Sequence, residues 1–158
     1  MTKSHIGKSL YFAPAAPATH DDTGFEALSW VKVNGVQQLP QLGVSHADID
    51  VPDLESGNTT RLKGAGTGQQ SQMSFRKVKD DTGQGNLRTA AEGHPGIGSV
   101  KIIRATGTGG APDTGDEVQY ATGYVKDFVE NQGTETTHEG FSVQFQQNGL
   151  TVNSTEPA

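Results

Sequence analysis

Four acidic side chains lie close together in the sequence, at Asp48, Asp50, Asp53 and Glu55, and carboxylates are the ligands that calcium prefers. A calcium-binding loop of the common kind needs a turn glycine at its sixth position and a bidentate glutamate at its twelfth. Counted from Asp48, these two positions hold Asp53 and Thr59. The spacing therefore favours a solvated or subunit-facing acidic edge, and we expect no metal site.

Three glycines at alternate positions, Gly64, Gly66 and Gly68, form a string of the kind that can cradle a phosphate. Such a cradle also needs a strand before the glycines and a helix opening after them, because free amides and the helix N-terminus must converge on the anion. Here the glycines lie in a polar, charged segment. We therefore expect neither a nucleotide nor another cofactor.

Residues that could act as a nucleophile or a base are scattered along the chain. There are five histidines and no cysteine. His138 and Glu139 are adjacent, so on a strand they point to opposite faces of the sheet. Because a catalytic group needs a positioned neighbour, we expect that the protein is not an enzyme.

Composition excludes several classes of partner. Acids outnumber bases 18 to 12, and the formal charge is −6, whereas strong binding to nucleic acid needs clustered cations. The lack of cysteine removes disulfides and thiolate metal sites and fits a reducing cytosol. No apolar run approaches the roughly 18 residues of a membrane span. We expect a soluble intracellular protein with no membrane partner.

The supply of core-forming side chains is small. Leu, Ile, Val and Phe together make up about one fifth of the 158 residues, which is near the composition at which chains begin to fail to fold. A chain of this length suits one domain. Burial between subunits would help to stabilise so thin a core.

Alternation of apolar and polar residues predicts a mainly β fold. The expected strands are 30–33, 39–51, 73–78, 99–105, 118–128 and 141–145, and Asn34 and Gly35 give a tight turn signal. One side of the strand 118–128 is expected to carry Val118, Tyr120, Thr122, Tyr124 and Phe128. The segments favour an antiparallel β-sandwich or half-open barrel.

One short α-helix is predicted between the strands. Asp81 or Thr82 can cap its start, and Gly93 followed by Pro95 ends it. At about two and a half turns the helix is too short to stand alone, so we expect it to plug one side of the barrel.

Residues 52–72 are predicted to form an extended loop arm. Loops beyond about 12 to 15 residues are uncommon in small domains and are usually functional or disordered. We interpret the segment as an arm that docks on another subunit, the alternative being a mobile surface loop. The residues expected to make this contact are Asp53, Leu54, Glu55, Arg61, Leu62, Lys63, Gly64, Gly66 and Gly68. The single domain, 1–158, would also have a loose N-terminal arm, 1–7, and a polar tail, 149–158.

The order of these parts resembles the tail tube, or major tail, proteins of long-tailed bacteriophages of the lambda type. The resemblance covers roughly residues 8–152. It is strongest at 31–36, where a lysine-bearing strand precedes the arm, and at 48–75, where an acidic segment leads through Gly64 to Gly68 into the next strand. Some relatives carry an additional immunoglobulin-like domain, which we do not expect here.

The resemblance implies a structural virion protein that self-associates into stacked, hexameric rings and builds a conduit for genome delivery. DNA would pass through this tube without specific binding. The implied partners are the tape measure, tail terminator and distal tail proteins. The protein would lie in the virion tail, and in the host cytoplasm during assembly.

By the same resemblance, the hairpin of residues 118–145 would lie on the inner wall of the tube. The acids that could face the lumen are Asp127, Glu130, Glu135 and Glu139. A net acidic chain suits a channel that must pass a polyanion without holding it. The alternative is that these four are ordinary solvated charges at strand ends.

Two other functions stay open from the sequence. One is the tube of a bacterial contractile injection or secretion system, which the resemblance does not separate from a phage tail. The other, of a different class, is a monomeric β-sandwich binding module, which would need exposed aromatic residues on a flat face.

Overall fold

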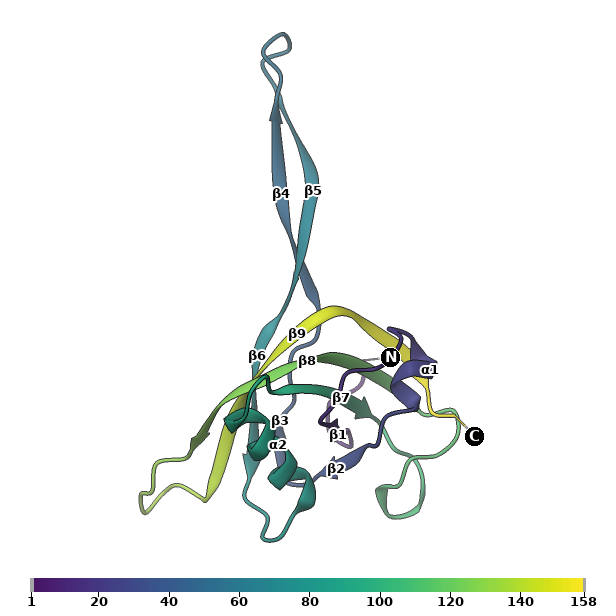
Figure 1. Cartoon of the computed structure of the whole chain (residues 1–158), viewed down its shortest axis with the longest axis vertical. Coiled ribbons are helices and arrows are strands. Elements are labelled where there is room, and N and C mark those ends of the chain that lie inside the picture. Colours follow the sequence, from purple (N-terminus) through teal and green to yellow (C-terminus); the bar gives the residue numbers. More distant parts are fainter. Residues whose placement is uncertain (1, 158) are drawn as a thin grey trace.

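A seven-stranded antiparallel sheet curls around the main core in the computed structural model, which describes residues 2–157 (Figure 1). The strand order is β2-β1-β7-β8-β9-β6-β3. The strands are β1 (Ser9–Ala13), β2 (Val31–Val33), β3 (Val36–Gln38), β6 (Gln70–Arg76), β7 (Ile97–Ile103), β8 (Glu117–Glu130) and β9 (Gly140–Thr155). The expected mainly β fold is confirmed, and of the two forms considered it is the half-open barrel.

The two edge strands of this sheet are consecutive in the chain. β2 pairs with β1 and β3 pairs with β6, so Asn34 and Gly35 span from one edge of the sheet to the other. The side-chain amide of Asn34 donates to Asp81 at 2.6 Å, and the Gly35 carbonyl accepts from the Arg76 amide at 2.6 Å. Asn34 and Gly35 therefore connect the edges covalently instead of making a hairpin.

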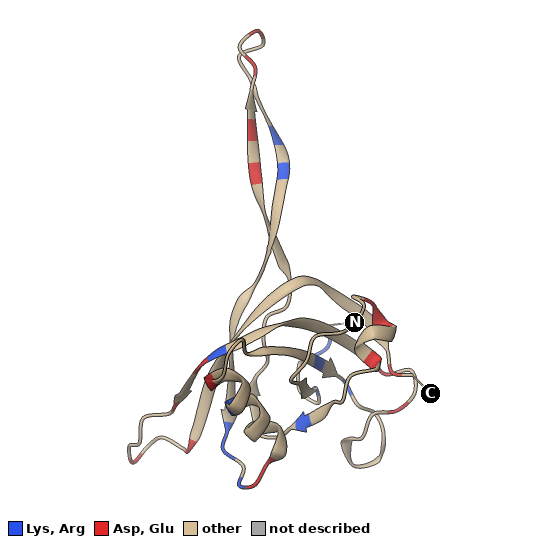
Figure 2. Ribbon diagram, viewed as in Figure 1, with Lys and Arg blue, Asp and Glu red and all other residues tan. Residues whose placement is uncertain are grey.

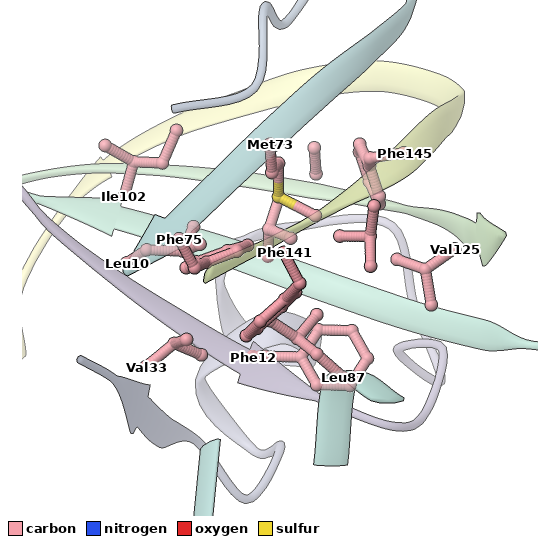
Figure 3. Close-up of a cluster of buried hydrophobic side chains, with 13 residues drawn as sticks. Leu10, Phe12, Val33, Met73, Phe75, Leu87, Ile102, Val125, Phe141 and Phe145 are labelled. Carbon is pink, nitrogen blue, oxygen red and sulfur yellow. The ribbon is translucent and has the colours of Figure 1, made fainter. Parts of the chain in front are cut away.

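The main core lies inside the curl of the sheet and is closed by helix α2 (Thr82–Glu92). Leu10 and Phe12 from β1 meet Phe75 from β6 and Phe141 from β9, and Leu87 of α2 points into the same cluster (Figure 3). Asp81 caps the helix by accepting from the Gln84 amide at 3.1 Å. The predicted helix and its plugging role are confirmed.

A second, smaller cluster lies on the other face of the sheet, beneath the one-turn helix α1 (Asp22–Glu26). Phe25 stacks on Tyr120 with ring centroids 5.2 Å apart. Side chains alternate along β8, so Val118 and Tyr120 face this cluster whereas Ala121 and Val125 face the main core. The expected shared side of Val118, Tyr120, Thr122 and Tyr124 agrees with this alternation. Phe128 is the exception and packs against the main core, because the pairing of β8 with β9 shifts between Lys126 and Val129.

The C-terminal segment also departs from expectation. Residues 149–158 were predicted to be a polar tail, but β9 continues to Thr155 because its backbone pairs with β8 as far as Glu117. Residues 108–110 form a 3-10 helix, η1 (Thr108–Gly110). Met1 and Ala158, at the ends of the two predicted terminal segments, lie outside the described residues. Among residues 2–157, no helix combines the length and apolar character needed to span a membrane.

The plug helix offers a test of the core. Leu87→Ala should lower the free energy of unfolding by about 2–5 kcal/mol, because Leu87 is fully buried and its loss leaves a cavity. Gly85→Ala, on the exposed side of the same helix with open space around it, should raise the free energy by about 0.5–1 kcal/mol. Urea unfolding followed by circular dichroism measures both. Equal effects from the two substitutions would contradict this packing.

Candidate subunit interaction surface

A two-stranded hairpin, β4 (Val44–Pro52) and β5 (Thr59–Gly68), projects from the body along the longest axis of the molecule (Figure 1). The arm predicted at 52–72 is therefore present, but the prediction that it is a loop is wrong. Its glycines and charges are typical of irregular structure, whereas the backbone of 59–68 pairs antiparallel with that of 44–52. β6 then begins at Gln70, inside the predicted loop.

One face of the hairpin is charged. Arg61 lies 3.2 Å from Asp50 across the strands, and Lys63 is opposite Asp48 in the register. Both partners of the Asp50–Arg61 ion pair are well exposed, so the pair contributes only about 0–1 kcal/mol. Along the strands, Asp48 and Asp50 are thus compensated by Lys63 and Arg61, whereas the acids at the tip, Asp53 and Glu55, are not (Figure 2).

The other face is apolar and uncovered. Ile49 lies opposite Leu62, and Val51 follows two positions along the same strand. These side chains are 50%, 53% and 43% exposed. A two-stranded hairpin is at best marginally stable in water, and one with an uncovered aliphatic face exposes a surface suited to burial against another protein.

The tip of the hairpin is an ordered turn. The Asp53 carboxylate accepts from the Glu55 amide at 3.0 Å and from the Ser56 hydroxyl at 2.9 Å, and the Gly57 amide donates to the Asp53 carbonyl at 3.0 Å. The hydrogen bond from Ser56, followed by that from the Glu55 amide, lowers the pKa of Asp53. Leu54, between Asp53 and Glu55 in this turn, is fully exposed.

The glycines of the arm allow close approach of neighbouring residues. A Cβ at Gly66 would crowd Val44 and the His46 ring, at 2.9 and 3.0 Å. A Cβ at Gly68 would collide with the carbonyl oxygen of Gln147 on β9. Gly64 lies against Ala47 at the irregularity in the β4–β5 register. The alternate glycines therefore keep the two strands close and seat β5 on the body.

Gln147 fixes the base of the hairpin and was not predicted. Its side chain is fully buried, accepts from the Gly43 amide at 2.9 Å, and donates to Thr151 at 2.9 Å and to the Gly149 carbonyl at 3.1 Å. The backbone N–H of Gln147 donates to the Gln69 carbonyl at 3.1 Å. The signal was present in the sequence, because Gln147 continues the alternation of Phe141, Val143 and Phe145. Alternation marks the position as inward-facing, but it does not show that a polar side chain is buried there.

The four predicted lumen acids all lie at the far end of the β8–β9 hairpin, away from the arm (Figures 1 and 2). Asp127 is at a register shift in β8 with φ of 56°, and Glu130 ends that strand. Glu135 and Glu139 belong to the connection between β8 and β9. All four are exposed and lie in one region, and Glu130 and Glu139 line a hollow at the start of α2.

A second unpredicted feature is a shielded ion pair. Lys101 on β7 lies 2.8 Å from Glu156, and these side chains are 7% and 18% exposed. Burial, followed by the nearby charge of Glu156, raises the pKa values of Tyr11 and Tyr120. The pair attaches the chain after β9 to the outer face of the sheet. Its partners are 55 positions apart in sequence, so spacing offers no signal for it.

Comparison with known proteins places this fold. Neither a scan against models of protein families nor a search of curated proteins finds a match. Among solved structures, the chain is similar to a subunit of the SPP1 tail tube, determined by solid-state NMR and cryo EM. The two are 14% identical with a TM-score of 0.62, and the match covers 96% of this chain and 78% of that one.

The chain therefore has a tail tube fold, which confirms the fold that the sequence resemblance implied. A crystal structure of Hcp protein also matches, with 11% identity and 94% and 98% of the two chains covered, but its TM-score of 0.38 is too low to support an argument.

Gln147 gives a test of how the arm is attached. Gln147→Leu should cost about 1–3 kcal/mol of unfolding free energy and speed amide exchange at Gly43, whose N–H loses its buried acceptor. Gln144→Leu, at a half-buried position on the opposite face of β9, should change neither by a comparable amount. Hydrogen exchange read by NMR measures the local effect. Unchanged exchange at Gly43 in Gln147→Leu would contradict the anchoring role.

Proposed function

We propose that this chain is a structural protein that self-associates into stacked rings and forms a tube. The fold supports this proposal, since the solved structure it resembles over 96% of its length is a tail tube. The chemistry of the arm supports it independently. Ile49, Leu62 and Leu54 are exposed on an ordered projection that the body of the same chain does not cover.

The observation that carries the proposal is this hairpin. An exposed aliphatic face on a two-stranded projection is costly in water and carries a risk of aggregation. It becomes favourable when a second copy covers it, at roughly 25 cal/mol per Å² of apolar area. A monomeric binding module does not need an exposed aliphatic projection, whereas a subunit that must contact its neighbours can use one as a contact surface.

We further propose that the rings are hexameric and that the tube is a conduit in a phage tail, with the β8–β9 hairpin toward the lumen. The outward face of β9 carries Ser142, Gln144 and Gln146, and Gln146 lies between Gln70 and Tyr124 in the register. Uncharged amides and the acids at the tip of this hairpin would let DNA pass without the cation contacts that retain it. The partners would be the tape measure, terminator and distal tail proteins.

Shortening the hairpin tests self-association. Replacing residues 47–65 by an Asn-Gly turn joins His46 and Gly66, which face each other across the strands, so the body should fold with little loss of stability. The variant should stay monomeric at concentrations where the unmodified chain forms rings or tubes. Sedimentation velocity and negative-stain microscopy measure this. Normal tubes from the shortened chain would remove the basis of the proposal.

Charge reversal tests the lumen assignment. Tubes carrying Glu130→Lys and Glu139→Lys should retain duplex DNA at low salt in a form that a nuclease cannot reach, because each new cation adds a phosphate contact inside the tube. The matched control is Asp22→Lys with Glu26→Lys, on α1 at the other side of the body (Figure 1). DNA held by the control should be digested. Digestion of the DNA in both would place Glu130 and Glu139 outside the lumen.

A further inference from the structure

A hollow of about 740 Å³ opens beside the main core, between the residues that precede β1 and those that follow β3. Its apolar lining includes Ile6, Leu39, Leu42 and Ile102. Ile6 is 85% exposed, although the Arg104 guanidinium donates to its carbonyl at 2.8 Å and so holds the segment in place. The volume lies within the range of about 300–1,000 Å³ that is usual for ligand sites.

The charge of this hollow is unusual for so acidic a chain. Lys8 lines it, and no Asp or Glu within residues 2–157 does, whereas acids outnumber bases 18 to 12 overall. An occupant that combines an aliphatic side chain with negative charge would therefore match both the apolar residues of the hollow and Lys8.

The tip of the β4–β5 hairpin has this combination. Leu54 is fully exposed between Asp53 and Glu55. Because the Asp53 carboxylate is used in hydrogen bonds to the Glu55 amide and the Ser56 hydroxyl, the turn is ordered before any contact is made. A preformed turn loses less conformational entropy on binding than a mobile loop. The Glu55 carboxylate makes no ion pair within the described chain and is available to a cation.

We infer that the hollow lined by Ile6, Leu39, Ile102 and Lys8 receives the hairpin tip of a second copy, with Leu54 on the apolar floor and Glu55 at Lys8. This inference rests on the proposed self-association and identifies the surface that receives the hairpin tip. The tip cannot fill the hollow of its own chain, because the nine and ten residues of β4 and β5 carry it about 30 Å away from the body (Figure 1).

Other hollows fit the tip less well. The hollow at the start of α2 is lined by Lys77, Lys79 and Arg88 and by four acids, Asp80, Asp81, Glu130 and Glu139. Its acids outnumber its bases, so it attracts Glu55 less than the hollow at Lys8 does. The groove near the end of α2, which includes Ile97, has an apolar lining but no Lys or Arg within the described chain to pair with Glu55. A further hollow shares Lys8 and Ile102 with the first and adds Arg104 and Glu117. The charge argument therefore favours the side of the body at Lys8, and Ile97 supplies a control site of similar apolar character.

The arrangement also fixes how the contact propagates. Each copy has one tip and one hollow at different places on its surface, so the contact is heterologous. A copy whose tip is bound still has a free hollow, and the next copy can bind there. Contacts of this kind build open polymers unless the rotation between copies closes a ring.

Disulfide trapping tests the inference cleanly, because the chain has no cysteine of its own. A copy with Leu54→Cys and a copy with Ile6→Cys, distinguished by tags of different length, are mixed and oxidised. The mixed dimer should form at least about tenfold faster than with an Ile97→Cys copy, because proximity raises the effective concentration of the two thiols. Equal trapping at both sites, or none at Ile6→Cys, would overturn the inference.

Charge exchange gives the second arm of the experiment. Glu55→Lys and Lys8→Glu should each raise the critical concentration for assembly, and the two together should restore part of the loss. Leu54→Ser should raise it about ten- to a hundredfold, the change expected when one leucine is no longer buried. If the unmodified chain forms tubes and these variants assemble equally well, the acceptor is wrong and self-association stands. If the unmodified chain never assembles, the proposed function fails as well.

Discussion

The β4–β5 hairpin is held in an extended form by the pairing of its two strands and by contacts at its two ends, since no other element of residues 2–157 packs on it along its length. At the base, Gln147 and Gly68 seat the strands on β9. At the tip, the Asp53 carboxylate closes the turn. Between them, cross-strand pairs such as Asp50 with Arg61 add only a little. Because an isolated hairpin is marginal in water, the projection depends on these two anchors and on what covers its aliphatic face.

The body forms a half-barrel from a chain that has few large apolar residues. The sheet is used on both faces, with the main cluster inside the curl and a smaller one under α1. Alternation along β8 allows one strand to serve both clusters, with Tyr120 on one face and Val125 on the other. Gly123 permits the close pairing of β8 with β9, because a Cβ there would collide with the Gln146 carbonyl oxygen.

Much of the body could be predicted from the sequence, since alternation marks β7 and β9 and capping residues mark α2. The arm could be located but not described. Thr59 to Gly68 has no apolar alternation of its own, and its strand character comes from pairing with β4, which is a tertiary effect. The opposed faces of the arm follow from that register. The same is true of Lys101 with Glu156, because folding alone brings these side chains together.

The two-residue link at Asn34 and Gly35 has a mechanical consequence. It ties the opposite edges of the sheet, and its hydrogen bonds to Asp81 and Arg76 tie it in turn to the start of α2 and the end of β6. The half-barrel therefore resists being spread or flattened. If copies of this chain form a filament, curvature of that filament would be absorbed by the slender hairpins between stiff bodies, so their length and stiffness would set how sharply the whole assembly can flex.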